Sequence, residues 1–161
     1  AAISHIAHVT WDATYHETIA VENRQDFLKR AYERSNLAPA IDVEGHWFYV
    51  AQSDMDVVGF AHFSRRYHPT QSRAELLRCY VLPENQRRGI GSALLNRGFT
   101  DLGTSGISQC FVSVQASNTK AQKFYERHQF VYHRDHGQFL GTQIITLKEY
   151  IRPIVLDEGV S

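Results

Sequence analysis

The sequence has few cysteines, no long apolar run and no excess of charge of either sign. Its two cysteines, Cys79 and Cys110, are too few for a disulfide framework in 161 residues, which favours a reducing, cytoplasmic compartment. No apolar run approaches the roughly 20 residues that span a membrane, so we expect no membrane partner. Lys and Arg together number 17, as do Asp and Glu. The resulting net charge of zero argues against general nucleic-acid binding, which needs a basic excess.

The order of apolar patterns predicts one α/β (α+β) domain over residues 1–150. Apolar residues three and four positions apart predict helices, and short runs of aromatic and β-branched residues predict strands. In chain order we expect helices from about residue 2 into the teens and over 21–35, strands over 46–53, 57–67 and 71–82, a helix over 89–103, a strand over 107–114, a helix over 117–129, and strands over 130–136 and 142–150. This mixture implies a mixed sheet with helices on its faces.

Residues 84–95, ENQRRGIGSALL, place two glycines between two arginines and an apolar run of helical spacing. The first N–H groups of a helix lack partners and carry a partial positive charge, so a helix start can bind an anion. Gly89 and Gly91 would let the anion approach closely, and Arg87 and Arg88 would add charge. The alternative is an ordinary turn with a basic, solvated face. The stretch is not a Walker A loop, because no Gly-Lys-Ser/Thr follows, and a dinucleotide fingerprint would need three glycines.

The longer stretch YVLPENQRRGIGSALL resembles the acetyl-CoA signature of the GNAT acyltransferases, Gln/Arg-x-x-Gly-x-Gly/Ala, which Gln86 to Gly91 match. A second block, NTKAQKFYERHQF, is similar to the family's Asn-x-x-Ala-x-x-Phe-Tyr-x-x-x-Gly-Phe, although Gln129 stands in place of the usual glycine. Two blocks in the family's order, about 30 residues apart, are far more specific than either one. The resemblance covers roughly residues 3–149 and implies the GNAT fold, with a mixed, mostly antiparallel central sheet flanked by about four helices.

The resemblance implies acetyl-CoA as the cofactor and assigns residues to its parts. The diphosphate is expected at the glycine turn, on Arg87, Arg88, Gly89, Ile90, Gly91 and Ser92. The pantetheine arm is expected along the preceding strand, on Cys79, Tyr80 and Val81, and against Asn118 and Tyr125. A bulge that splays this strand from residues 107–114 would expose the backbone groups that the arm needs, but the sequence does not show one. No metal ion is expected among the site residues.

Acetyl transfer to an amine needs one group that protonates the leaving thiolate and one that deprotonates the amine. Tyr125 occupies the family's general-acid position, and a phenol with a pKa of about 10 is protonated at neutral pH. Its alternative role is packing on the inner face of its helix. Some family members carry a glutamate base where this chain has Ser113, and others carry one at the position of Glu75. Glu75 is therefore our candidate base, directly or through a water, with a solvated strand-end carboxylate as the alternative.

Two further expectations concern the same strand. Strand alternation would place Glu75 on one face together with Leu77, Cys79 and Val81. Cys79 has no histidine close to it in sequence, so we do not expect it to act as a nucleophile.

The acceptor is predicted from weaker similarities. The stretch TWDATYHETI is similar to the first helix of many family members, where it lines the acceptor pocket, so Trp11 and Tyr15 could form a pocket wall or simply belong to the core. We expect a primary amine, and the loose similarity of QFLGTQIITLKEY to the final hairpin of polyamine acetyltransferases favours a polyamine or another small-molecule amine. A protein N-terminus or lysine is the alternative acceptor. Two alternatives are not enzymes: a sensor that binds acyl-CoA without turnover, and a structural or interaction protein whose glycine turn binds no ligand.

The C-terminal stretch YIRPIVLDEGVS resembles the opening strand, IRPAxxxD, that family members carry before their first helix. This sequence opens directly in a helix. Only one or two residues separate the last predicted strand from IRP, which is too short a connection for the tail to reach the far edge of its own sheet. Residues 151–161 are therefore expected to form a tail or an edge strand exchanged in a homodimer.

Overall fold

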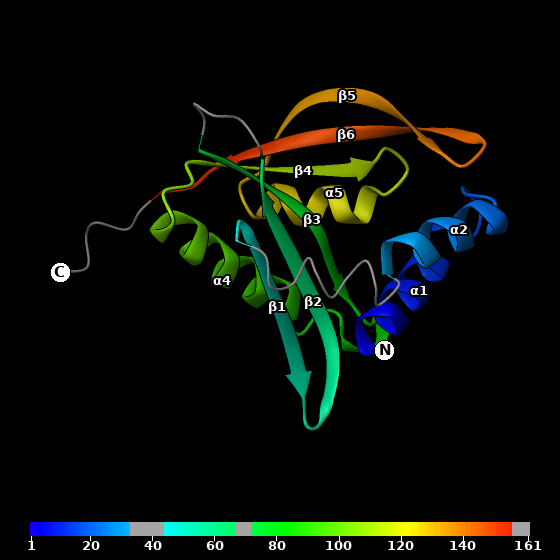
Figure 1. The fold of residues 1–161 in the computed structure, drawn as a ribbon, viewed down its shortest axis with the longest axis horizontal. Helices are drawn as coiled ribbons and strands as arrows, with labels where there is room; N and C mark the ends of the chain where they lie inside the picture. The colour runs from blue at the N-terminus through cyan, green and yellow to red at the C-terminus, as the bar shows by residue number, and fades with distance from the viewer. Residues whose placement is uncertain (33–43, 67–71, 156–161) are drawn as a thin grey trace.

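The computed structural model describes residues 1–32, 44–66 and 72–155 (Figure 1). The order of elements is the predicted one, with a short 3-10 helix, η1 (Pro83–Asn85), added before the glycine turn. The helices are α1 (Ala2–Tyr15), α2 (Val21–Tyr32), α4 (Ile90–Thr104) and α5 (Thr119–Arg127). The strands are β1 (His46–Ser53), β2 (Asp56–Arg65), β3 (Arg73–Val81), β4 (Gln109–Gln115), β5 (Val131–Leu140) and β6 (Gln143–Pro153). Residues 33–35 of the second predicted helix lie outside the described residues.

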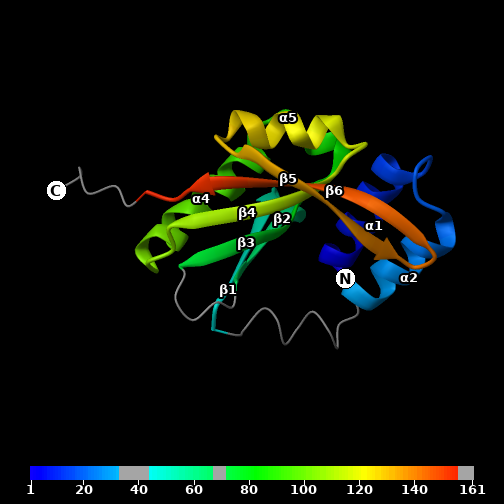
Figure 2. The ribbon, with the colours of Figure 1, turned by 90° about the horizontal axis from the view of Figure 1, so that it is seen from above.

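The six strands form one sheet in the order β1-β2-β3-β4-β6-β5. Only the central pair, β3 and β4, is parallel, and the other neighbouring strands are antiparallel. The prediction of a mixed, mostly antiparallel sheet is confirmed. In both ribbon views α1 and α2 lie together at one end of the molecule, away from α4 (Figures 1 and 2).

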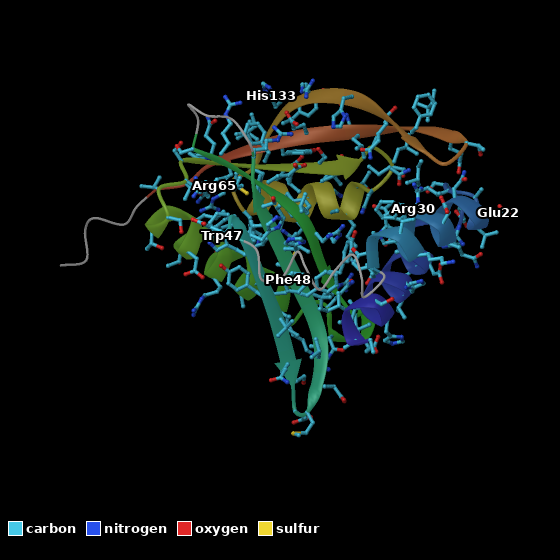
Figure 3. The ribbon with its side chains drawn as sticks, viewed as in Figure 1. Glu22, Arg30, Trp47, Phe48, Arg65 and His133 are labelled. Carbon is cyan, nitrogen blue, oxygen red and sulfur yellow. The ribbon has the colours of Figure 1, made fainter. Side chains whose placement is uncertain are left out.

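Side chains from the two faces of the sheet build separate cores. Under α4 and α5, buried apolar residues such as Phe63, Leu95 and Val112 form one cluster. Under α1 and α2, a second cluster is built from residues such as Ile6, Leu28 and Phe60. The adjacent Trp47 and Phe48 on β1 join different clusters because successive strand residues point to opposite faces (Figure 3). Helices therefore cover both faces, as the alternation of patterns along the chain predicted.

The parallel contact between β3 and β4 ends abruptly. Residues 73–76 pair with residues 109–112, and the rest of β3 has no partner in β4. At the same point the register of β3 against β2 shifts, so that Leu77 is an extra residue between the pairs of Leu76 and Arg78. A bulge of this kind bends its strand. The structure therefore contains the bulge and the splayed strands that the family resemblance implied and the sequence did not reveal.

The bulge also makes the predicted alternation along β3 wrong. Glu75 was expected to share a face with Cys79 and Val81. Instead Leu76 packs in the same core cluster as Cys79 and Val81, and Glu75 points to the opposite face, towards Arg66. The reason is physical: one extra residue at Leu77 reverses which positions face α4.

The C-terminal boundary lies later than predicted. β6 continues through Pro153, and residues 151–153 pair with residues 109–111 of β4. The N–H of Ile154 donates to the carbonyl of Ser108 at 2.8 Å, and Ile154 is buried in the core. Residues 151–155 are thus part of the domain and need no partner chain, whereas 156–161 lie outside the described residues. A homodimer stays a prediction, which the mass in gel filtration tests.

Gly98 on α4 offers a test of how tightly this helix packs. A Cβ at this position would lie 2.3 Å from Cε2 of the fully buried Phe63. Alanine improves helix propensity by about 1 kcal/mol, but such a clash costs about 1–3 kcal/mol or more. We expect Gly98→Ala to lower the free energy of unfolding by about 1–2 kcal/mol in thermal or urea denaturation, because the clash outweighs the propensity.

The matched control is Asn96→Ala, an exposed position on the same helix. That change is expected to alter stability by about 0.5 kcal/mol or less. A Gly98→Ala protein more stable than the wild type would contradict the close packing of α4 on β2.

Candidate active site

The turn before α4 presents a row of unused backbone donors. Arg87 and Gly89 both have left-handed backbone angles, with φ of 65° and 78°. The first helical hydrogen bond runs from the N–H of Ala93 to the carbonyl of Gly89, at 3.0 Å. Within the described residues, no acceptor pairs with the N–H groups of residues 87–92, and no side chain caps the helix. Alternating left- and right-handed residues at a helix start direct successive N–H groups to one point, which suits an anion. We call residues 87–92 the anion cradle.

A cavity of about 910 Å³ runs from the anion cradle, between the splayed strands, to α1. Its volume is typical of a site for a large cofactor or ligand. The described residues that line it include no Asp or Glu, whereas five of them are cationic: Arg78, Arg87, Lys120, Lys123 and Arg127. A cavity with this charge suits a ligand that carries several phosphate groups.

This cavity brings together most of the residues singled out from the sequence. It is lined by all the predicted cofactor residues except Arg88, and by Tyr125, Trp11 and Tyr15. Arg88 is exposed and does not line the cavity, and Glu75 also lies outside it. Arg87 is therefore the one cationic side chain of the anion cradle that lines the cavity.

Helix α1 is fixed to the cavity by two side-chain contacts. The indole N–H of Trp11 donates to the hydroxyl of Tyr80 at 2.9 Å. Asn118 caps α5 by accepting from the N–H of Ala121 at 3.1 Å, and its Nδ2 donates to the hydroxyl of Tyr15 at 3.4 Å. Burial raises the pKa of Tyr15 to about 12, so this hydroxyl stays protonated. Asn118 is thus the N-cap of α5, and the two aromatic residues of α1 form a cavity wall.

Tyr125 reaches the same cavity from α5. The residue is 8% exposed, and its hydroxyl has no hydrogen-bond partner among the described residues. Burial is the main cause that raises the pKa of this phenol well above 10. Beside it, burial raises the pKa of the Cys79 thiol to about 12, which leaves it without thiolate character. Tyr125 therefore has a proton that it can donate into the cavity, and Cys79 is not equipped to be a nucleophile.

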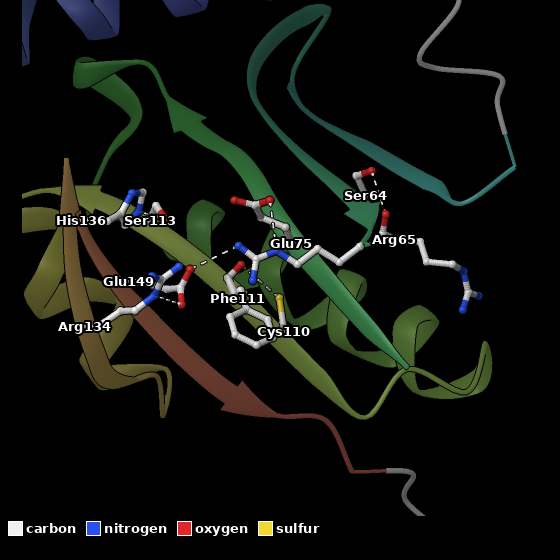
Figure 4. Close-up of polar contacts among 10 residues, drawn as sticks. Ser64, Arg65, Glu75, Cys110, Phe111, Ser113, Arg134, His136 and Glu149 are labelled. Carbon is white, nitrogen blue, oxygen red and sulfur yellow. Dashed lines mark hydrogen bonds and ion pairs between the residues drawn. The ribbon is translucent and has the colours of Figure 1, made fainter. Parts of the chain in front are cut away.

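Glu75 belongs to a group of charged residues on the other face of the sheet (Figure 4). Its carboxylate lies 3.7 Å from Nε of Arg66, whose Nη2 donates to Glu149 at 3.2 Å. Arg134 donates to the second oxygen of Glu149, also at 3.2 Å. Burial raises the pKa of Glu75, while Arg66 acts in the opposite direction. The predicted base is thus held in an ion-pair network at the side of the cavity.

Sequence reasoning missed several contacts because they join distant segments. Oγ of Ser92, in the anion cradle, lies 2.9 Å from Nε2 of His128. Nζ of Lys120 donates to the side chain of Gln86 at 2.6 Å. On β4, Oγ of Ser113 lies 3.3 Å from Nε2 of His136. A signal for the basic rim was present, since Lys120, Lys123 and Arg127 recur three and four residues apart, which places them on one helix face.

Comparison with known proteins shows which family this chain resembles. A model of the acetyltransferase (GNAT) family matches residues 6–130. Mycothiol acetyltransferase from Streptomyces griseus is 35% identical over 95 residues, which are 59% of this chain but only 30% of that protein. Spermidine N(1)-acetyltransferase from Thermoplasma acidophilum is 26% identical over 132 residues, and the match covers 78% of each chain.

The solved structures agree on the fold. The crystal structure of the PaiA N-acetyltransferase from Thermoplasma acidophilum in complex with coenzyme A superposes with a TM-score of 0.76 at 24% identity, covering 92% of this chain and 91% of that one.

Within residues 1–32, 44–66 and 72–155, no helix is long and apolar enough to cross a membrane. The structure contains the splayed strands and the glycine turn that the family resemblance implied. Because the family model also matches most of the sequence, the chain belongs to the acetyltransferase (GNAT) family.

Proposed function

We propose that the protein transfers the acetyl group of acetyl-CoA to a primary amine, by direct attack of the amine on the thioester in a ternary complex. The observation that carries this proposal is the single cavity that joins the anion cradle, the free edge of β3 and the phenol of Tyr125. A cofactor that carries phosphates at one end and a thioester at the other has the length and charge for such a cavity.

Each part of the cavity has a role in this proposal. The anion cradle binds the diphosphate through backbone N–H groups, and the basic rim on α5 adds electrostatic attraction. The edge of residues 77–81, which has no partner in β4, offers backbone groups to the amide-containing pantetheine arm. The thioester then lies in the gap between β3 and β4, near Tyr125. When the amine has attacked and the C–S bond breaks, Tyr125 gives its proton to the thiolate.

The acceptor that we propose is a small-molecule amine, with a polyamine as the first choice. The support is the match over 78% of the chain to a protein named spermidine N(1)-acetyltransferase. The described cavity lining contains no carboxylate. The remaining positive charges of a polyamine would therefore meet acidic groups outside this lining.

Two measurements test the proposal in sequence. Isothermal titration is expected to show saturable binding of acetyl-CoA to the wild-type protein. Release of free thiol is then expected with at least one member of a panel of polyamines, amino acids and peptide N-termini. Absence of acetyl-CoA binding would remove the proposal altogether. Binding without thiol release from any amine would mark the protein as a non-catalytic acyl-CoA binder.

A further inference from the structure

Ser113 lies at the point where β3 and β4 separate, opposite Tyr125. Val112 and Val114 on β4 pack with Tyr125 in the core beneath α4 and α5. Because strand residues alternate, Ser113 between them points to the other face of the sheet. Ser113 still lines the cavity, since β3 no longer covers it there. The gap between the strands therefore has a phenol on one side and a hydroxyl on the other.

The hydroxyl of Ser113 is not isolated. Its Oγ lies 3.3 Å from Nε2 of His136, and the two side chains approach each other from neighbouring parts of the sheet (Figure 4). His136 is half-buried on β5, on the side away from the helices that hold the anion cradle. Serine alone is too weak a base to deprotonate an amine, but an imidazole on its hydroxyl can take the proton that it passes on.

Charged groups surround His136 from three strands. Glu75 on β3 and Asp135 on β5 each interact electrostatically with it. On β6, Lys148 lies 3.4 Å from Asp135, and Glu149 is held by Arg66 and Arg134. The nearby positive charges are thus each matched by a carboxylate.

We propose that Ser113 and His136 form the proton relay that deprotonates the acceptor amine. The inference rests on the acetyltransferase function proposed above and deepens it. Ser113 contacts the amine, and His136 is a positioning and proton-accepting residue that acts through it. Glu75, bound by Arg66 outside the cavity lining, then acts on His136 by its charge instead of on the substrate.

The proposed reaction releases one proton for each amide formed. The acceptor arrives as an ammonium ion and gives one proton to Oγ of Ser113 while the hydroxyl proton moves to Nε2 of His136. From there it leaves to solvent. The nitrogen lone pair forms the C–N bond, the C–S bond breaks, and Tyr125 protonates the sulfur. The second nitrogen proton is lost on collapse of the tetrahedral intermediate and restores the phenol. The products are the amide, the free thiol and one released proton.

The test compares His136→Ala with His133→Ala by thiol release across pH. His133 is an exposed histidine on the same strand whose side chain makes no hydrogen bond or ion pair with the described residues, so it controls for the loss of an imidazole from β5 (Figure 3). We expect His136→Ala to lower kcat/KM for the amine about 100-fold, to abolish the decline of activity between about pH 8 and 5, and to be partly rescued by added imidazole. Binding of acetyl-CoA is expected to be unchanged.

The outcomes separate the relay from the proposed function. If His136→Ala keeps the wild-type rate and still loses activity as the pH falls, the relay is wrong. If Glu75→Gln then abolishes this loss of activity at low pH, the base is Glu75. Ser113→Ala should lower the rate to a similar extent, and it decides the question alone if His136→Ala does not fold. If the wild type binds acetyl-CoA but acetylates no amine, the function itself fails and the relay fails with it.

Discussion

Replacing Gly89 with valine is expected to weaken acetyl-CoA binding about 100-fold, or about 3 kcal/mol. Gly89 has a φ of 78°, a left-handed conformation that a β-branched residue adopts only with strain. Relieving that strain would rotate the N–H groups of the anion cradle away from their common point. Hydrogen bonds to a charged group contribute about 1.5–3 kcal/mol each, so losing one or two accounts for the expected change. Isothermal titration with acetyl-CoA measures it.

The strain itself must be separated from the loss of the cradle, and Gly106 offers a matched control. Its φ is 80°, and a Cβ on it would meet nothing within 4 Å, as is also true of Gly89. It follows the other end of α4, away from the cavity lining. Gly106→Val should lose about the same stability, roughly 1–2 kcal/mol, but keep full affinity for acetyl-CoA. Equal affinity in both variants would show that the cradle does not hold the diphosphate.

The arrangement of elements could be predicted from the sequence because each pattern was local. Alternating and helical spacings decided strands and helices, and the Gly89 turn followed a strand and preceded a helix. The glycine turn and the NTKAQKFY block are also local, so the chain's membership of the GNAT family was predicted from the sequence.

What could not be predicted depends on contacts between distant segments. The bulge at Leu77 arises where β3 pairs with β2 on one side and separates from β4 on the other, and no residue type in the sequence indicates it. For this reason the predicted sheet face of the Glu75 side chain was wrong. His136 reaches Ser113 only because β5 and β4 lie on either side of β6 in the sheet. A histidine 23 residues away in sequence gives no sign of that contact.

Replacing Tyr125 with phenylalanine is expected to lower kcat about 100-fold or more while leaving acetyl-CoA binding nearly unchanged. The change removes only the hydroxyl, which has no hydrogen-bond partner among the described residues, so folding stability should hold. Burial raises the pKa of this phenol well above 10. The acid form is the active one and is lost only as pH rises through that pKa. The wild-type rate should therefore show no decline from Tyr125 at neutral or mildly alkaline pH.

A matched control is Tyr49→Phe, which removes a phenol hydroxyl that donates to Asp101 at 2.7 Å, away from the cavity lining. It should keep the wild-type kcat, although it loses a hydrogen bond and with it about 1 kcal/mol of stability. Steady-state kinetics of thiol release for both variants at pH 7 and 9 make the comparison. Tyr125→Phe turnover at the wild-type rate would exclude this phenol as the general acid.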